Sequence, residues 1–218
     1  MTKPYLILLL IQLAAVQAFA QAGGGIEQYH YVSSSSPYLY MPVVHLQNRK
    51  HWYAEARYNY EDLNTFSLHI GKTFQNDNRF SYSFTPLLGA VAGKFNGVSA
   101  GVNMDLSYDN VFFSTQSQYS ISKDAHTNNF FYNWSEMGYQ CVRWLDAGIS
   151  AQHTQSVSAG SSLEPGVFLR LSYKQYTIPL YAFNPLYRNN YFIVGLSYEW
   201  QRSKPRNTPV VANTTVNE

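Results

Sequence analysis

Residues 98–108 alternate between apolar and polar side chains without an exception. The start of the run, Val98-Ser99-Ala100-Gly101-Val102, shows the pattern: every second residue is apolar, and those between are small or polar. Successive side chains of a β-strand point to opposite faces, so such a strand has one apolar and one polar face. A tilted strand of about 9–11 residues crosses the core of a lipid bilayer. The run therefore predicts one membrane-spanning β-strand.

Nine further segments have a similar length and pattern, which gives ten predicted strands. The ten cover residues 52–61, 65–74, 80–91, 98–108, 111–121, 130–139, 145–152, 167–173, 176–183 and 191–200. Tight connections (75–79, 109–110, 140–144 and 174–175) alternate with others that tend to be longer and more polar (122–129, 153–165 and 184–190). Short turns at one end and longer loops at the other are typical of outer-membrane barrels, and only a closed sheet satisfies every backbone group in lipid. We therefore predict an all-β fold, a transmembrane antiparallel up-and-down β-barrel spanning residues 51–200.

The N-terminus has the features of a secretory signal peptide. Lys3 supplies a positive charge, residues 5–16 are almost unbroken apolar sequence, and Ala18-Phe19-Ala20 is a small-x-small cleavage site. We expect residues 1–20 to be removed and the exported chain to begin at Gln21. The predicted location is the cell outer membrane of a Gram-negative bacterium.

Residues 21–50 allow two interpretations. Glycines at 23–25 and serines at 33–36 favour a flexible periplasmic segment, whereas residues 38–46 are apolar and rich in strand-forming residues. The segment is then either a plug that folds into the lumen or part of the wall. Adding residues 38–46 alone gives eleven strands, an odd number that bacterial single-chain barrels avoid. Adding residues 27–32 as well gives twelve, which is the alternative to ten.

Composition agrees with a thin wall that is apolar outside and polar inside. Only 13% of residues are charged and 17% are aromatic, while the mean hydropathy is −0.27. A formal net charge of +2 gives no indication of a nucleic-acid partner. Cys141 is the single cysteine, so an internal disulfide is excluded.

Seven ionisable residues are predicted to point into the lumen. Because charges in a confined space need partners, we expect a polar network that fills the barrel. Interiors of about eight strands are filled by side chains, so a ten-stranded barrel favours a filled lumen and a structural or surface-exposed role. A narrow polar pore for small solutes is the nearest alternative. The predicted network consists of Glu55, Arg57, His69, Asp105, Glu136, Asp146 and Arg170.

An outer-membrane enzyme acting on lipid or peptide is a further alternative. His153 with Ser156, and His126 with Asp124, are neighbours that could supply a base and its partner. Sequence spacing does not show hydrogen-bond reach, and neighbours of this kind arise by chance, so we assign no catalytic residue. No histidine or cysteine pair has the close spacing of a structural metal site, and no metal or cofactor is expected.

The last predicted strand ends Gly195-Leu196-Ser197-Tyr198-Glu199-Trp200. This ending resembles the terminal signal by which the barrel-assembly machinery recognises bacterial outer-membrane proteins, and Gly195, Leu196, Tyr198 and Trp200 would carry it. Residues 52–200 as a whole, with the stretches 53–61 and 132–136, resemble the small, mostly uncharacterised outer-membrane β-barrels of Gram-negative bacteria. The resemblance implies two partners, outer-membrane lipids and the assembly machinery, and leaves the oligomeric state open. One departure is that residues 201–218 follow the signal; their Pro, Asn, Thr and charged residues predict a disordered tail.

Overall fold

The computed structural model describes residues 23–33, 37–158 and 160–200. The predicted signal peptide and the predicted tail lie outside these residues. Within them, no helix is both long and apolar enough to span a membrane.

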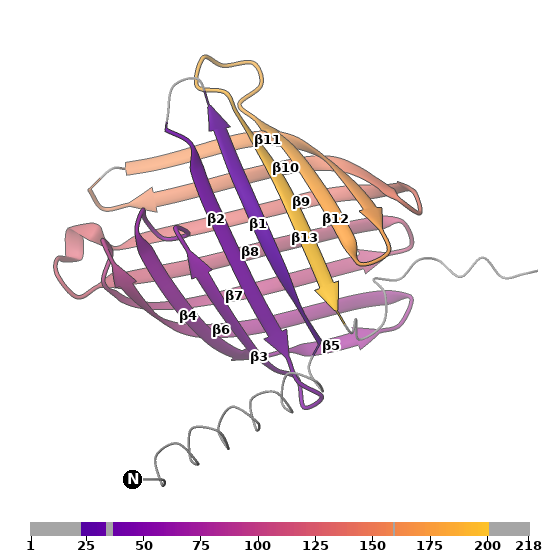
Figure 1. Ribbon diagram of the computed structural model, residues 1–218, viewed down its shortest axis with the longest axis horizontal. Coiled ribbons are helices and arrows are strands. Elements are labelled where there is room, and N and C mark those ends of the chain that lie inside the picture. The colour runs from indigo at the N-terminus through magenta and orange to yellow at the C-terminus, as the bar shows by residue number, and fades with distance from the viewer. Residues whose placement is uncertain (1–22, 34–36, 159, 201–218) are drawn as a thin grey trace, which may run out of the picture.

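The described chain consists of β-strands and one short 3-10 helix (Figure 1). The strands are longest between β6 and β11, where alternation in the sequence is also clearest. In chain order the elements are β1 (Gly23–Ser33), β2 (Leu39–Gln47), β3 (Trp52–Tyr58), β4 (Thr65–Lys72), β5 (Phe74–Asp77), β6 (Phe80–Gly93), β7 (Gly97–Tyr108), β8 (Val111–Ser122), the helix η1 (His126–Asn128), β9 (Phe130–Val142), β10 (Leu145–Ser156), β11 (Gly160–Tyr173), β12 (Tyr176–Phe183) and β13 (Tyr191–Trp200).

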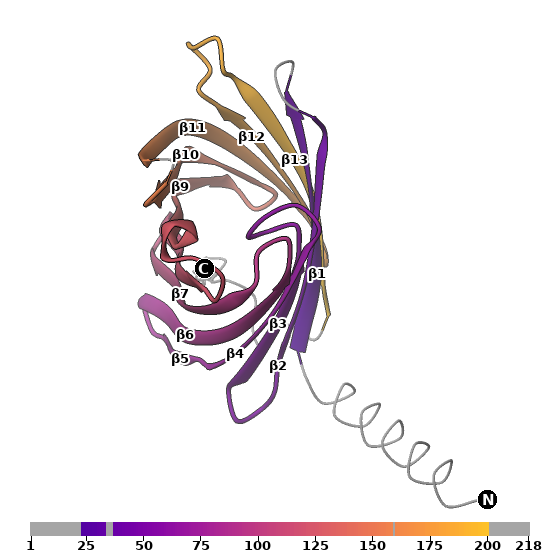
Figure 2. The ribbon, with the colours of Figure 1, turned by 90° about the vertical axis from the view of Figure 1, so that its left-hand side faces the viewer.

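The strands form a single antiparallel sheet that closes on itself. β1 pairs with β13 from Gly24 opposite Trp200 to Ser33 opposite Tyr191, and β4 pairs with β6. Figure 2 shows the sheet curving into a ring, with β1 and β13 side by side. Closure gives each strand of the ring a neighbour on both sides, which satisfies the backbone groups that would otherwise face lipid.

The short strand β5 continues β4 beside β6. Gly71 lies opposite Leu87 and Phe74 lies opposite Phe84, so both strands keep one register. The interruption falls near Pro86 of β6, which has no backbone N–H to donate to the ladder. The ring itself therefore has twelve strands, with β5 as an extension of β4.

The two ends of the barrel differ. We call the end that holds Gly23 and Trp200 the turn end, because the tight turns 109–110, 143–144 and 174–175 also lie there. Asp109 and Lys174 have φ angles of 50° and 53°, the left-handed backbone that two-residue hairpins require. The opposite, loop end carries the connections 59–64, 94–96, 123–129 and 184–190.

The closed antiparallel barrel is confirmed, but the strand number of ten is wrong and the alternative of twelve is right. Residues 23–33 and 39–47 lie in the wall as β1 and β2, rather than in the lumen. The pattern is obscured in β1 because polar residues occupy its outer face. Gln28 accepts a hydrogen bond from the Tyr40 hydroxyl at 3.2 Å, and His30 is bonded to the Tyr38 hydroxyl. Aromatic neighbours on the outside thus hydrogen-bond polar groups that appear in the sequence as a break in alternation.

The outer face carries the apolar belt that a membrane requires. Ile70, Leu88 and Ile149 each expose 60% or more of their surface, which in a soluble protein would be an unusual density of exposed aliphatic residues. Aromatic side chains gather on the outside near the turn end, as in the interfacial girdles of membrane barrels. These exposed aromatics include Trp52, Tyr108, Tyr139, Trp144, Tyr173 and Tyr176.

Candidate functional site: the barrel lumen

The lumen holds a cavity of about 500 Å³. Its lining comes from strands around most of the ring and lies mainly in the half of the barrel nearer the turn end. Gln75, Asp77, Ser107 and Glu199 line it near that end, while Arg57 and others line its inner end. The prediction of a lumen filled by side chains thus fails for this half, because a ring of twelve strands is wider than one of ten.

Acidic residues outnumber basic ones in the cavity wall. Seven carboxylates and three arginines line it, so the wall has four more acidic than arginine side chains. A confined space with low-dielectric walls concentrates such a potential and raises the local concentration of counter-ions. The carboxylates belong to Glu27, Glu55, Asp77, Asp105, Glu136, Asp146 and Glu199, and the guanidinium groups to Arg57, Arg143 and Arg170.

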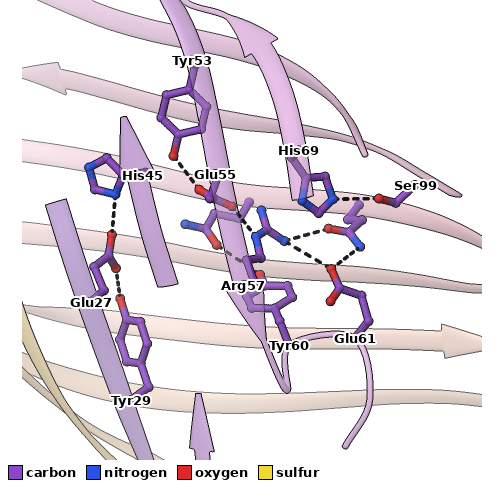
Figure 3. Close-up of polar contacts among 12 residues, drawn as sticks. Glu27, Tyr29, His45, Tyr53, Glu55, Arg57, Tyr60, Glu61, His69 and Ser99 are labelled. Atoms are coloured by element: carbon purple, nitrogen blue, oxygen red, sulfur yellow. Dashed lines mark hydrogen bonds and ion pairs between the residues drawn. The ribbon is translucent and has the colours of Figure 1, made fainter. Parts of the chain in front are cut away.

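Arg57 is the centre of the first ion-pair cluster (Figure 3). Its side chain is buried and donates from Nε to Glu55 Oε1, which lies two residues away on the same inward face of β3. Its Nη1 donates across the lumen to Gln118 Oε1 of β8 at 2.7 Å. The guanidinium also lies 4.1 Å from the centre of the Tyr60 ring. Arg57 therefore joins two distant parts of the wall.

Arg170 is the centre of the second cluster. It donates from Nη2 to Glu136 Oε2, and its Nη1 lies 3.7 Å from Asp146 Oδ2. Glu136 Oε1 accepts a further hydrogen bond from the Tyr181 hydroxyl at 2.7 Å. The guanidinium lies 5.2 Å from the centre of the Phe168 ring. Four neighbouring strands, β9 to β12, thus contribute to one cluster in which the buried guanidinium has two carboxylate partners, as a buried charge requires.

The remaining predicted network residues are His69 and Asp105, and His69 lies opposite Glu55 in the register of β3 and β4. His69 is fully buried, and its Nε2 lies 2.7 Å from Ser99 Oγ. Asp105 lines the cavity from β7. The predicted residues therefore form two ion-pair clusters, with His69 beside the first of them and Asp105 as a further acidic group in the wall.

A third polar cluster contains residues that the sequence did not predict as site residues. Glu27 accepts a hydrogen bond from the Tyr29 hydroxyl, and the Nδ1 atom of His45 lies 3.4 Å from Glu27 Oε1 (Figure 3). These residues belong to β1 and β2, which the ten-strand prediction left outside the wall. The sequence carries a signal for this cluster, because Glu27, Tyr29 and Tyr31 occupy every second position and so share one face of a strand.

The half of the lumen nearer the loop end is packed with aromatic and polar side chains, which we call the septum. Tyr31 stacks on Tyr191 with ring centres 6.1 Å apart, and Tyr191 stacks on the fully buried Phe183 at 5.1 Å. Tyr60 meets Tyr132 edge-on at 5.5 Å. The septum comprises Tyr31, Tyr60, Glu61, Gln118, Tyr132, Gln152, Phe183 and Tyr191, and among these only Tyr60 lines the cavity.

The histidine pairs considered for an enzyme are not formed as predicted. His153 Nε2 lies 3.0 Å from Ser161 Oγ, while Ser156 Oγ lies 3.1 Å from Ser158 Oγ. No hydrogen bond joins His126 to Asp124 in the described chain. In the same residues, no group of three or more His, Cys, Asp or Glu is placed to hold a metal ion.

The predicted assembly signal lies in β13, between β1 and β12. Leu196 and Tyr198 are exposed on the outer face. Gly195 faces inward, where a Cβ atom would come within 2.6 Å of the Pro179 ring. Recognition by the assembly machinery stays a prediction.

Comparisons with known proteins agree with this architecture. No protein-family model matches the sequence, and no curated protein matches it. Among solved structures, the KdgM porin is similar with a TM-score of 0.59 and 10% identity, over 81% of this chain and 99% of that chain. The two chains share one fold. The NanC porin is similar with a TM-score of 0.51 and 11% identity, over 81% of this chain and 100% of that one. A second KdgM structure, in complex with disordered oligogalacturonate, has a TM-score of 0.61 at 10% identity and covers the same shares of the two chains. These likenesses support an outer-membrane location for the barrel.

Proposed function

We propose that this protein is a narrow channel of the outer membrane for small polar solutes, with a preference for cations. The observation that carries the proposal is the cavity of about 500 Å³ inside a closed membrane barrel, because a purely structural wall has no use for a polar space of this size. Rings of carboxylates favour cations in channels, and this wall has seven carboxylates against three arginines. The solute class thus follows from the charge of the wall.

The charge of the wall argues against a polyanionic solute. One similar structure is the KdgM porin in complex with disordered oligogalacturonate, and an oligogalacturonate carries a carboxylate on each sugar unit. Here both buried arginines in the cavity wall are already paired, Arg57 with Glu55 and Arg170 with Glu136. A polyanion would meet the excess of carboxylates without a comparable set of available cations. We therefore propose small cationic or neutral polar solutes.

The proposal includes the setting of the barrel. The chain is exported by its signal peptide and inserted by the barrel-assembly machinery, with the turn end in the periplasm and the loop end outside. Its apolar belt contacts outer-membrane lipids.

Replacing Asp105 by Asn should reduce the cation preference of the channel. Asp105 lines the cavity from β7, so its charge acts directly on ions in the lumen. In planar bilayers under a salt gradient, we expect wild-type reversal potentials on the cation-selective side and a shift toward zero in the variant. Asp124→Asn, in the exposed connection 123–129, is the control and should leave the potential unchanged. Anion selectivity in the wild type would contradict the proposal.

A structural role without conduction is the second candidate, and the packed septum favours it. In that case the protein would occupy the outer membrane as a closed wall, with the cavity reachable from one end. Absence of conductance in the wild type and in variants with a loosened septum would favour this role over the channel.

A further inference from the structure

The connection 59–64 folds into the barrel rather than away from it. The sequence predicts that the strand starting at Trp52 continues to Glu61, but β3 ends at Tyr58 because Asn59 adopts a left-handed φ of 59°. Asn64 is left-handed too, with a φ of 53°, and its backbone N–H donates to Asn59 Oδ1 at 2.7 Å. Asparagine tolerates this backbone better than most residues. The two asparagines set the direction of the chain between them.

This fold carries Tyr60 and Glu61 into the lumen, where they contact β8. The Tyr60 hydroxyl donates to Gln116 Oε1 at 3.1 Å, and Gln118 Nε2 donates to Glu61 Oε1 at 3.2 Å. Glu61 Oε1 also lies 4.0 Å from Arg57 Nη1. The connection therefore spans from β3 to β8 and forms part of the septum at the inner end of the cavity (Figure 3).

This connection is held by side-chain contacts rather than by a strand ladder, and those of Glu61 are incompletely satisfied. Its other anchors include Asn59 Nδ2, which donates to the Tyr40 backbone oxygen at 2.9 Å, and Asp62 Oδ1, which accepts from Lys94 Nζ at 3.0 Å. The Glu61 side chain is fully buried, yet its Oε2 atom has no hydrogen-bond partner in the described chain. A buried carboxylate oxygen without a donor is costly, so it opposes the inward position that the other contacts favour. The wall on either side is instead held by continuous strand ladders. The connection is therefore the part of the septum that can leave the lumen without breaking the ring.

We propose that residues 59–64 are a movable barrier of the channel, held closed by the bonds of Tyr60 and Glu61 to Gln116 and Gln118. This inference rests on the proposed channel function. In the closed position the septum separates the cavity from the loop end. When Tyr60 and Glu61 withdraw, the contact between the Tyr60 and Tyr132 rings is lost and the cavity extends toward the loop end. Tyr60 and Glu61 then set how often the channel is open.

The first test removes a single hydroxyl without creating a hole. In single-channel recordings, Tyr60→Phe should raise the open fraction roughly fivefold, because it deletes one hydrogen bond that exists only in the closed position. Tyr40→Phe is the matched control: it removes a hydroxyl that bonds Gln28 on the outer face, and it should change nothing. Both variants should keep the heat-dependent gel migration of a folded barrel.

The second test fixes the barrier in place. A variant with Glu61→Cys and Gln118→Cys, made with Cys141→Ser, is bridged by a bifunctional methanethiosulfonate whose bonds a reductant cleaves. We expect conductance to disappear on bridging and to return on reduction. The same bridge between Arg79→Cys and Asp109→Cys, a pair at the turn end whose charged groups lie 3.2 Å apart, should leave conductance intact.

The outcomes separate the two proposals. Equal conductance in the bridged and reduced states, or an unchanged open fraction in Tyr60→Phe, would overturn the movable barrier and leave the channel standing. Silence of the wild type, of Tyr60→Phe and of the reduced cysteine pair, all of them folded, would overturn both. Loss on bridging together with increased opening in Tyr60→Phe supports the barrier.

Discussion

Arg57→Ala should lower the free energy of unfolding of the barrel by about 3 kcal/mol. The side chain is only 3% exposed, and its loss leaves two neighbouring carboxylates, Glu55 and Glu61, without their cation in a confined lumen. Gln118 loses the hydrogen bond that its Oε1 atom accepts from Arg57 Nη1 at 2.7 Å. Breaking a buried pair by removing one partner is costly because the remaining charge stays buried. Urea unfolding in detergent micelles, followed by tryptophan fluorescence, measures the change.

Arg79→Ala is the matched control for Arg57→Ala. Arg79 also pairs with a carboxylate, Asp109 at 3.2 Å, and this hydrogen bond raises the pKa of its guanidinium. The pair lies in solvent at the turn end, where such bridges contribute little. We expect an unchanged unfolding midpoint. Equal midpoints for wild type and Arg57→Ala would show instead that water in the cavity screens Glu55 and Glu61 effectively.

The sequence predicts the wall from Trp52 onward because each strand there has one face toward lipid and the other toward the polar lumen. Lipid selects apolar residues outside and the lumen selects polar ones inside, so the period of two is visible in strands such as β7. The same rule predicts that Glu136 and Arg170 share the lumen. Their direct pairing follows only from the neighbouring positions of β9, β10 and β11 and from the register between them.

The features that the sequence did not predict depend on contacts between distant segments. The membership of β1 in the wall is not evident from the sequence because Gln28 and His30 occupy its outer face. These polar side chains are compatible with lipid because Tyr40 of β2 and Tyr38, just before β2, hydrogen-bond to them. A strand that continued through Asn59 to Glu61 would place Tyr60 on the outer face, whereas the left-handed backbone of Asn59 reverses the pattern. The septum could not be predicted at all, since its contacts cross a ring whose diameter depends on the number of strands.

The second cluster depends on two glycines that face each other across neighbouring strands. Gly138 of β9 is the register partner of Gly148 of β10. A Cβ atom on Gly148 would lie 2.2 Å from the backbone oxygen of Met137 and 2.7 Å from the Phe168 ring. The missing side chains make room for the aromatic rings on which the Arg170 guanidinium rests.

Gly148→Val should therefore destabilise the barrel by about 3 kcal/mol, at the upper end of what overpacking costs, because backbone as well as a side chain must move. Displacement of Phe168 also moves Arg170 away from Glu136, so the variant should lose ion-pair stabilisation in addition to packing. Ala147→Val adds bulk to the adjacent residue of β10, whose side chain points to the lipid, and should leave the urea midpoint close to that of the wild type. A midpoint for Gly148→Val equal to that of Ala147→Val would mean that the lumen around Phe168 has room to relax. The Arg170 cluster would then be held by its ion pairs rather than by the aromatic rings that support it.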